Sequence, residues 1–337
     1  MLSSLTIREY RDEDEDAVLH LLRVALGAGR TFDRTPTFWR WKHFQNPFGP
    51  SLLTVARNQE VCGLRALLRW RFRAGGRLVQ AVRAVDTATH PAHRRHGVFS
   101  ALTRQTLERA RQEGVDLVFN TPNAISLRGY VKLGWTLVGR PSVLVRPVRP
   151  LRMVQAVVRG AATGDGERPV GRPAMPVGAW LHHGVERLLE ADDGLHAARI
   201  RTDRSVAFLR WRYASLPAPT YFVCWLGAPH ALEAAAIFRQ GRRRGMREVL
   251  VSEVLLRGSP AAVPVLVRQV LAATDADYLV AFAPPGTVHR RGLLRAGFVP
   301  LPRGPYFTVL PLTAGSAALQ PTRLARWFLS LGDLELF

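Results

Sequence analysis

The chain has 337 residues, of which 47% are hydrophobic, and it carries a formal net charge of +21 at pH 7. This length suits two domains, and the hydrophobic content excludes a chain that is disordered by composition. Only Cys62 and Cys224 occur, which excludes a disulfide framework and a cysteine-based zinc site. Residues 1–8 lack the pattern of a secretory signal, and no apolar run approaches the roughly 18 residues that span a bilayer. We therefore expect a cytoplasmic protein with no membrane span.

Arginine carries nearly all of the positive charge, because Lys42 and Lys132 are the only lysines among the 47 basic residues. Such a bias indicates genome composition more than selection for a binding site. A large positive charge favours anionic partners such as a coenzyme or a nucleic acid. The arginines are scattered, however, and no zinc finger, RNA-recognition signature or basic helix is evident. We therefore expect a solvated basic surface and no nucleic-acid partner.

Apolar patterning predicts alternating helices and strands in the first half of the chain. Helical spacing of apolar residues predicts helices over 12–27, around 38–41, over 97–114 and after 123. Apolar runs bounded by turn residues predict strands over 5–10, 52–56, 61–72, 78–89, 115–119 and 135–148. The last of these strands is expected to close a first lobe. Trp39 and Trp41 are expected in its core.

The start of the helix at Gly97 has the properties of an anion site. The first turn of a helix leaves four N–H groups unpaired, and the helix dipole adds partial positive charge there. Gly97 has no Cβ, so a phosphate can approach the backbone closely, and Arg94 and Arg95 lie just before it. Taken alone, this pattern fits an ordinary strand–helix turn better than a ligand site.

Two motifs in sequence resemble those of the GNAT (Gcn5-related) N-acetyltransferases. The first is the phosphate loop of that family, matched here by Arg94, Gly97 and, imperfectly, Phe99. The second has the family's spacing of an Asn, a small residue, a Tyr, a Gly and an aromatic residue, and it consists of Asn123, Ser126, Tyr130, Gly134 and Trp135. Phe99 stands where a second Gly or Ala is usual. The nearest variety is the two-lobed, enhanced-intracellular-survival type, in which a bulkier residue there is familiar.

The resemblance implies acetyl-CoA as the cofactor and gives roles to individual residues. Backbone groups of the strand 86–89 would pair with the pantetheine arm, and the loop 94–99 would bind the pyrophosphate. The residues expected at the cofactor are Thr87, Ala88, Thr89, Arg94, Arg95, His96, Gly97, Val98, Phe99, Asn123 and Ser126. Tyr130 would protonate the departing thiolate, since a phenol (pKa about 10) lies close to a thiol (about 8.5). Asp86, the sole carboxylate on the cofactor strand, would accept a proton or orient a cationic amine.

Each of these assignments has a structural alternative. Tyr130 also fits the core face of an amphipathic helix, and Asn123 fits equally well as a cap of the helix that follows it. Asp86 fits as a strand residue whose carboxylate holds a neighbouring turn. The histidines at 90, 93 and 96 lie across a turn without Cys, Asp or Glu at ligand spacing, so we expect no metal site.

After residue 149 the chain changes character and then repeats itself. Glycines and prolines punctuate residues 150–178, which indicates a linker or a long loop. The motif at 38–42 then recurs at 208–212, and Gly134-Trp135 recurs as Gly297-Phe298, which predicts a duplicated domain. The second copy has lost the chemical motifs. Gly97 aligns with Val267 at an offset of 170 or with Pro260 at an offset of 163, and at the latter offset Tyr130 and Asn123 align with Leu293 and Gly286.

We therefore predict an α+β fold of the GNAT type in two tandem lobes, each with a mixed, mostly antiparallel sheet flanked by helices. The expected division is a catalytic lobe, a linker with a connecting helix, a degenerate lobe and a docked C-terminal tail, over residues 1–149, 150–190, 191–312 and 313–337. The tail is rich in Trp, Phe and Leu, and exposing it to water would cost several kcal/mol at roughly 25 cal/mol per Å². Asp333, Glu335 and the terminal carboxylate are candidates to hold or deprotonate an amine; the alternative is a tail that only covers the second lobe.

The resemblance implies an N-acetyltransferase that moves an acetyl group from acetyl-CoA to a primary amine of a small-molecule or peptide acceptor. Two alternatives stay open: a non-catalytic acyl-CoA-binding or interaction protein, and an aminoacyl-tRNA-dependent transferase, which the net charge would suit. The sequence identifies neither the acceptor nor the oligomeric state.

Overall fold

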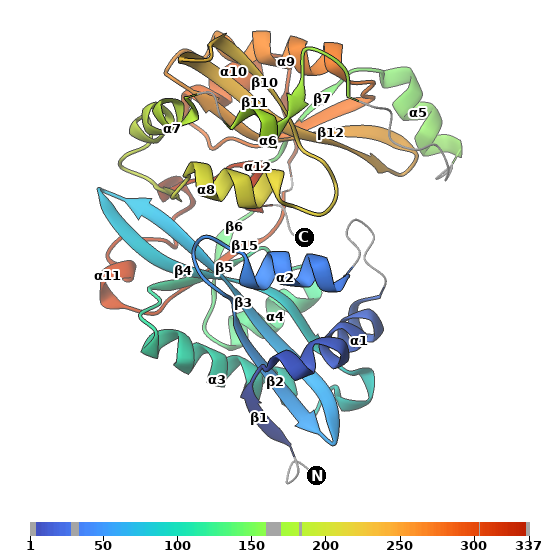
Figure 1. The fold of residues 1–337 in the computed structure, drawn as a ribbon, viewed down its shortest axis with the longest axis vertical. Helices are drawn as coiled ribbons and strands as arrows, with labels where there is room; N and C mark the ends of the chain where they lie inside the picture. The colour runs from blue at the N-terminus through green and yellow to red at the C-terminus, as the bar shows by residue number, and fades with distance from the viewer. Residues whose placement is uncertain (1–4, 28–33, 160–169, 182–183, 303, 335–337) are drawn as a thin grey trace. The chain divides into compact units, whose positions relative to one another are not determined.

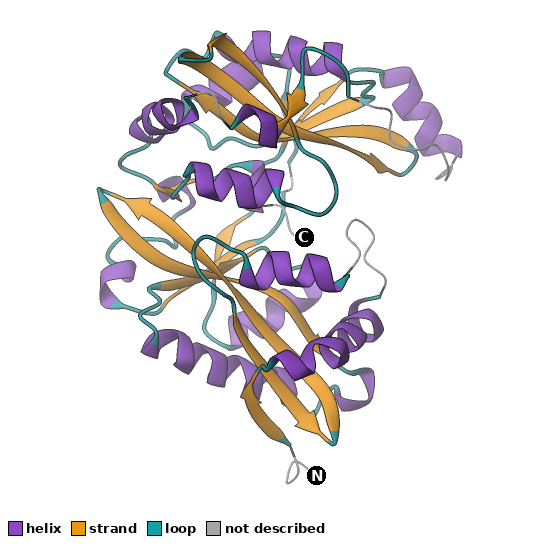
Figure 2. Ribbon diagram, viewed as in Figure 1, coloured by secondary structure: helices purple, strands orange, loops and turns teal. Residues whose placement is uncertain are grey.

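The structure is a computed structural model that describes residues 5–27, 34–159, 170–181, 184–302 and 304–334. The chain divides into two compact units, one formed mainly by Met1–Gly139 with Tyr306–Arg323 and the other mainly by Arg140–Pro305 with Leu324–Glu335. Each unit contains one mixed, mostly antiparallel sheet with helices packed against it (Figures 1 and 2). The predicted α+β class is confirmed.

The sheet of the first unit has the strand order β1-β2-β3-β4-β5-β15-β6. Its neighbouring strands are antiparallel except β4 and β5, which are parallel. The strands are β1 (Thr6–Glu9), β2 (Leu52–Asn58), β3 (Glu60–Ala74), β4 (Arg77–Thr89), β5 (Leu117–Asn120), β6 (Thr136–Gly139) and β15 (Phe307–Pro311). The helices are α1 (Glu15–Leu26), α2 (Pro36–Phe44), α3 (Val98–Gln112), α4 (Ala124–Lys132) and α11 (Ala314–Ala317).

The sheet of the second unit has the matching order β8-β10-β11-β12-β13-β7-β14, again with one parallel pair, β12 and β13. Its strands are β7 (Leu144–Pro147), β8 (Met175–Pro176), β10 (Phe222–Ala228), β11 (Ala231–Arg243), β12 (Met246–Leu256), β13 (Tyr278–Ala281) and β14 (Val299–Pro300). The helices are α5 (Pro150–Arg159), α6 (Val177–Trp180), α7 (Val185–Gly194), α8 (Val206–Leu209), α9 (Ala262–Ala273), α10 (Val288–Arg295) and α12 (Leu331–Leu334). A short parallel pair, β9 (Ile200–Thr202) and β16 (Trp327–Phe328), completes the described strands of this unit.

The two sheets exchange one strand each. β7 follows the first unit in sequence but pairs with β13 and β14 in the second sheet. β15 follows the second unit but pairs with β5 and β6 in the first sheet. The expectation that residues 135–148 close the first lobe is therefore correct for β6 and wrong for β7, and the observed division at Gly139 differs from the predicted boundary at 149. Apolar patterning predicts a strand but does not choose its partner.

Residues 150–159 form α5, so part of the stretch whose glycines and prolines indicated a linker or a long loop is helical. The predicted division includes a connecting helix within residues 150–190. Leu151, Val154 and Val158 recur at helical spacing behind a proline in the first turn, and this pattern outweighed the glycines that begin at position 160. Most of the remaining glycine-rich stretch, residues 160–169, lies outside the described residues.

The repeated aromatic motif is buried in both units, as predicted for core residues: Trp39, Trp41, Phe208 and Trp211 are at most 4% exposed. At the aligned chemical positions, Leu293 is buried in α10. The N-cap of α10 is Thr287, which follows Gly286, the position that aligns with Asn123. The second unit thus repeats the scaffold without a tyrosine at the corresponding place.

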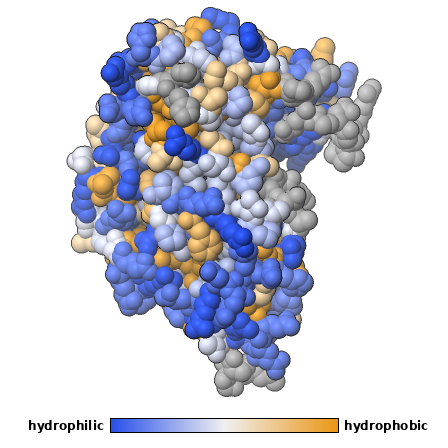
Figure 3. All heavy atoms as spheres, in the orientation of Figure 1, coloured by the Kyte–Doolittle hydropathy of each residue, from blue (hydrophilic) through white to orange (hydrophobic). Residues whose placement is uncertain are grey.

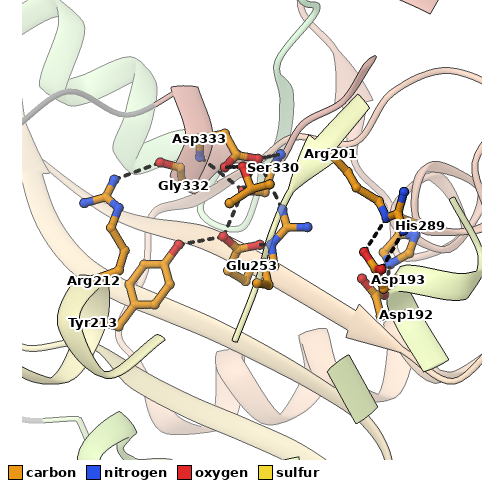
Figure 4. A network of polar contacts seen from close by, with 12 residues as sticks. Asp192, Asp193, Arg201, Arg212, Tyr213, Glu253, His289, Ser330, Gly332 and Asp333 are labelled. Carbon is orange, nitrogen blue, oxygen red and sulfur yellow. Dashed lines mark hydrogen bonds and ion pairs between the residues drawn. The ribbon is translucent and has the colours of Figure 1, made fainter. Parts of the chain in front are cut away.

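Residues 324–334, at the end of the described part of the chain, belong to the second unit. Trp327, Phe328, Leu331 and Leu334 are buried, and a polar network holds the segment within the second unit (Figure 4).

In this network Asp333 accepts hydrogen bonds from Thr202 at 2.7 Å and from Arg204 at 3.2 Å, and Ser330 donates to Glu253 at 2.9 Å. The Asp333 side chain is 1% exposed and fully engaged, which argues against a role in binding an amine. Glu335 and the terminal carboxylate lie outside the described residues.

Candidate active site

A cavity of about 870 Å³ opens in the first unit where β4 and β5 separate. The two strands pair only through Ala81, Val82 and Arg83 of β4, and past Arg83 their backbones diverge. The cavity is lined by the free edge of β4, the residues after β5, and the starts of α3 and α4, namely Ala84–Thr89, Asn120–Asn123, Arg94, Phe99, Ile125, Ser126, Gly129 and Tyr130, together with Ala25, Leu26 and Arg34. An extended ligand can therefore lie along an unpaired strand edge.

A β-bulge shapes the edge of β4 beside this cavity. Leu64 of β3 pairs with Ala88 and Ala66 pairs with Val85, so Arg65 faces both Asp86 and Thr87. Asp86 has φ +38°, a left-handed conformation that is uncommon outside glycine. Bulges of this kind redirect side chains and occur frequently next to active sites. Here consecutive side chains reach different partners: Asp86 contacts α2, and Thr87 contacts Arg65.

Asp86 is paired with two buried side chains of α2. Its Oδ2 lies 2.5 Å from Lys42 Nζ and 3.2 Å from His43 Nε2, and His43 Nδ1 lies 2.9 Å from the Ser51 hydroxyl. Burial alone would raise the pKa of Asp86, but the charge of Lys42 and the hydrogen bond from His43 outweigh it and hold that pKa well below its usual value. Burial lowers the pKa of Lys42 and of His43 against the attraction of Asp86.

The sequence left two roles open for Asp86, a chemical role toward the amine and a structural role in the strand, and these contacts distinguish between them. A carboxylate whose pKa is strongly lowered is a poor proton acceptor at neutral pH. Its negative charge is already compensated by Lys42, so little attraction remains for a cationic amine. The geometry favours the structural role, in which Asp86 ties the strained bulge of β4 to α2.

Tyr130 lies at the cavity wall and is supported by a residue that the sequence did not suggest. Arg65 Nη1 donates hydrogen bonds to the Tyr130 hydroxyl and to the Thr87 hydroxyl, both at 2.9 Å. The Tyr130 side chain packs against Trp135, with ring centroids 5.2 Å apart, and is 5% exposed. A signal was present: Arg65 interrupts the apolar run 61–68, where an arginine needs a buried partner.

Phe99 occupies the position where the resembling family has Gly or Ala. It is the second residue of α3, and its ring lies edge-on to Tyr130, with centroids 5.8 Å apart. A Cβ on Gly129 would come within 3.2 Å of that ring, so the glycine makes room for Phe99. The bulky residue is therefore accommodated by α4 and forms part of the cavity wall.

The residues predicted at the cofactor divide into two groups. Those that line the cavity are Thr87, Ala88, Thr89, Arg94, Phe99, Asn123 and Ser126, and the predicted catalytic pair Asp86 and Tyr130 line it as well. Arg95, His96 and Gly97 lie on the exposed loop that precedes α3, and they do not line the cavity. Val98 is 2% exposed and packs with Leu102, so only its backbone is available to a ligand.

Both helix starts at the cavity have recognisable caps. Gly97 caps α3 with φ +77°, and the first helical bond runs from Ala101 N–H to the Gly97 carbonyl. The N–H groups of the preceding residues in that turn have no partner within the helix. Asn123 caps α4 by accepting from Ile125 and Ser126 N–H at 3.0 and 2.8 Å. The predicted capping role of Asn123 is therefore filled, at a position that also lines the cavity.

If the start of α3 binds the pyrophosphate of acetyl-CoA, as the sequence predicts, Gly97→Val should weaken acetyl-CoA binding by at least about tenfold. An L side chain at φ +77° is strained, and relief of the strain would turn the N–H groups of the first turn away from the cavity. The matched control is Gly114→Val at the other end of α3, where φ is +71° and the space around a Cβ is equally open. Calorimetric titration of both variants gives the comparison; equal affinities would contradict a role for the α3 start.

Within the described ranges no three His, Cys, Asp or Glu side chains gather in a way that could hold a metal ion. Nor does any helix of this part of the chain reach the length and hydrophobicity needed to cross a membrane. Figure 3 shows mainly hydrophilic residues over the face in view, with hydrophobic residues in small patches.

Residues 6–138 match the family model described as an acetyltransferase (GNAT) domain. This range contains both sequence motifs and all of the residues that line the cavity. No curated protein sequence matches the chain.

Solved structures resemble the chain over both units. A GCN5-related N-acetyltransferase from Anabaena variabilis has a TM-score of 0.66 at 16% identity, covering 93% of this chain and 74% of that one. A conserved protein from Enterococcus faecalis, a probable N-acyltransferase, has a TM-score of 0.62 at 12% identity, covering 93% and 73%. Saccharomyces cerevisiae N-myristoyltransferase with bound myristoyl-CoA has a TM-score of 0.61 at 10% identity, covering 92% and 83%. The likeness confirms the predicted GNAT-type fold with two lobes.

Proposed function

We propose that this protein is an acetyl-CoA-dependent N-acetyltransferase whose first unit performs the reaction. The observation that carries the proposal is the cavity between β4 and β5, where an unpaired strand edge, a helix start and Tyr130 meet. Pairing of a pantetheine arm with a strand edge and of phosphates with a helix start needs these two features. The myristoyl-CoA bound to the N-myristoyltransferase neighbour supports an acyl-CoA ligand for this fold.

The residues that we propose to hold the cofactor are the predicted ones that line the cavity, together with the backbone at the start of α3. Backbone groups of Thr87, Ala88 and Thr89 would bind the pantetheine, and the N–H groups at the start of α3 would bind the pyrophosphate. Arg94 donates to the carbonyls of Thr89 and Ala25 at 3.4 and 3.2 Å, which fixes the end of β4 beside α1. Holding thioester and amine together removes much of the entropic barrier to their reaction.

The chemical step needs an amine, a stabilised carbonyl oxygen and a proton for the leaving sulfur. The amine nitrogen attacks the thioester carbonyl carbon, the C–S bond breaks, and the sulfur leaves with the bonding electrons. Tyr130 would transfer its hydroxyl proton to that sulfur, and the new amide nitrogen would release a proton to solvent. Amide N–H groups on the free edge of β4 would polarise the carbonyl.

Turnover with a panel of amines tests the function directly. Acetyl-CoA should release free thiol in the presence of at least one aminoglycoside, polyamine, amino sugar or peptide amine. Comparison of acetyl-CoA with longer acyl-CoA thioesters shows which length of acyl group the protein transfers. Tight acetyl-CoA binding without thiol release would favour a non-catalytic acyl-CoA-binding protein. Salt-sensitive tRNA binding would favour the aminoacyl-tRNA-dependent alternative.

We further propose that the second unit is a degenerate copy that arose by duplication, as in acetyltransferases of the enhanced-intracellular-survival type. The matching strand orders of the two sheets and the buried aromatic motif support this proposal. A cytoplasmic location is proposed from the use of only two cysteines, both of which are buried and unbonded.

Calorimetric titration should give one acetyl-CoA site per chain. The second unit has a leucine, Leu293, where α4 has Tyr130, and its α9 begins after Ala261 without a glycine. The Gly97→Val variant is the control that assigns the site to the first unit. A stoichiometry near two would contradict the loss of function in the second unit.

A further inference from the structure

A buried guanidinium lies directly behind the proposed general acid. Arg65 is 0% exposed, and its Cζ lies 5.8, 5.1 and 5.9 Å from the ring centroids of Phe99, Tyr130 and Trp135. Nη1 makes the two hydrogen bonds to Thr87 and Tyr130, whereas Nε and Nη2 have no hydrogen-bond partner among the described residues. A charge this deeply buried, with three of its five N–H donors unused, costs free energy that an apolar side chain would not.

The hydrogen bonds determine which way the Tyr130 proton can point. A guanidinium has five donors and no acceptor, so the phenol oxygen must accept from Arg65. The phenol proton is then unable to bond to Arg65 and remains available on the cavity side, where Tyr130 forms part of the wall. Thr87 donates its own proton to the Val85 carbonyl at 3.2 Å and accepts from Arg65. Arg65 thus connects Thr87, in the bulge of β4, to the Tyr130 hydroxyl on α4.

We infer that Arg65 is the positioning residue that holds Tyr130 as a proton donor and stabilises the phenolate which forms when the proton leaves. The inference rests on the proposed acetyl transfer. When the Tyr130 proton passes to the thiolate sulfur, the phenol oxygen gains a negative charge, and the bond from Nη1 becomes a bond between two charged groups. The bond is charge-assisted from the start, and the Coulomb attraction between guanidinium and phenolate is added to it as the proton leaves, so the interaction strengthens as the reaction proceeds. An interaction of this kind raises kcat more than it tightens substrate binding.

The three aromatic rings explain how the cation is retained without a carboxylate. Their faces attract a guanidinium electrostatically, and the attraction is larger away from water. A carboxylate in the same place would neutralise Arg65 and remove its effect on the phenol oxygen. Phe99, the residue that departs from the family pattern, is one of the three rings. Its aromatic side chain therefore helps to retain the Arg65 cation, which Gly or Ala could not do.

The experiment combines substitutions at Arg65 and Tyr130. Arg65→Met keeps the length of the side chain in an apolar environment, so we expect a folded protein. Its kcat should fall about 10- to 100-fold, the effect of one hydrogen bond to a charged group. The dissociation constant of acetyl-CoA should change less than about threefold. Arg65→Lys should recover part of the lost kcat. The positive charge remains, but the planar guanidinium that holds both the Thr87 and the Tyr130 hydroxyl is lost.

The control on the same strand is Arg69→Met, which removes a surface ion pair with Glu113 and should leave kcat unchanged. The decisive comparison is made in a Tyr130→Phe background. Because Arg65 acts through the phenol, the double variant Tyr130→Phe with Arg65→Met should have the same kcat as Tyr130→Phe alone.

Each outcome separates the inference from the proposed function. Wild-type protein that releases no thiol with any amine overturns the function and this inference with it. Wild-type turnover combined with an unaffected Arg65→Met variant overturns the inference alone. An Arg65→Met effect that persists undiminished in the Tyr130→Phe background assigns Arg65 a purely structural role and also overturns it. If Arg65→Met does not fold, the same comparison is made with Arg65→Lys.

Discussion

Tyr130→Phe should lower kcat by roughly 10²–10⁴-fold, the usual cost of losing a general acid. The ring stays packed against Phe99 and Trp135, so only the hydroxyl and its bond from Arg65 are lost. Affinity for acetyl-CoA should therefore change little. Steady-state thiol release and calorimetric titration measure the two quantities separately.

A matched variant shows whether the effect belongs to this hydroxyl. Tyr278→Phe removes another largely buried tyrosine hydroxyl, one that donates to Glu248 at 2.7 Å in the second unit. Its kcat should equal that of the wild type. A decrease of less than about threefold for Tyr130→Phe would return Tyr130 to the role of a core residue.

Asp86→Asn should destabilise the first unit by about 3–5 kcal/mol, the usual cost of removing one partner from a buried ion pair. The substitution removes the negative charge that compensates Lys42, whose side chain is 2% exposed. Asparagine tolerates positive φ nearly as well as aspartate, so the strained backbone at φ +38° is not the cause. Denaturant unfolding at pH 7 measures the loss.

Two further measurements assign this loss to the charge. Lys42→Met combined with Asp86→Asn removes both charges and should recover most of the stability. The lowered pKa of Asp86 also fixes the pH dependence: the advantage of the wild type is complete above the ordinary carboxyl pKa of 3.8 and shrinks as the pH falls below it. A pH-independent difference, or a double variant as unstable as the single one, would show that the ion pair is not responsible.

The sequence was most informative where the chemistry is local. The strand before residue 90, the glycine at the start of α3 and the motif from Asn123 to Trp135 each lie within a short stretch, so spacing alone placed them. The cavity brings together most of the residues predicted at the cofactor, but it does not include the exposed loop at 95–97. Helix dipoles and caps act within one turn, so short motifs are enough to predict sites at helix starts such as those of α3 and α4.

The partners of the site residues were beyond sequence reasoning because they lie far away along the chain. Arg65 contacts a tyrosine on α4, and Lys42 and His43 contact Asp86 across the β-bulge. The position of Arg65 within the apolar run 61–68 indicates that it needs a buried partner, but not which residue that partner is. A lysine where arginine is otherwise the rule was a usable signal, and Lys42 is one of only two.

The exchange of β7 and β15 has a consequence during synthesis. Ribosomes release the chain from its N-terminus, so β15 emerges only after nearly all of the second unit. Until then the first sheet lacks the strand between β5 and β6 and presents two open edges, which are sites for aggregation and for chaperones. A nascent or prematurely terminated chain that ends before residue 307 therefore cannot complete the sheet that carries the cavity, although its cavity-lining residues all precede residue 131. Completion of the first sheet thus requires synthesis to continue through β15.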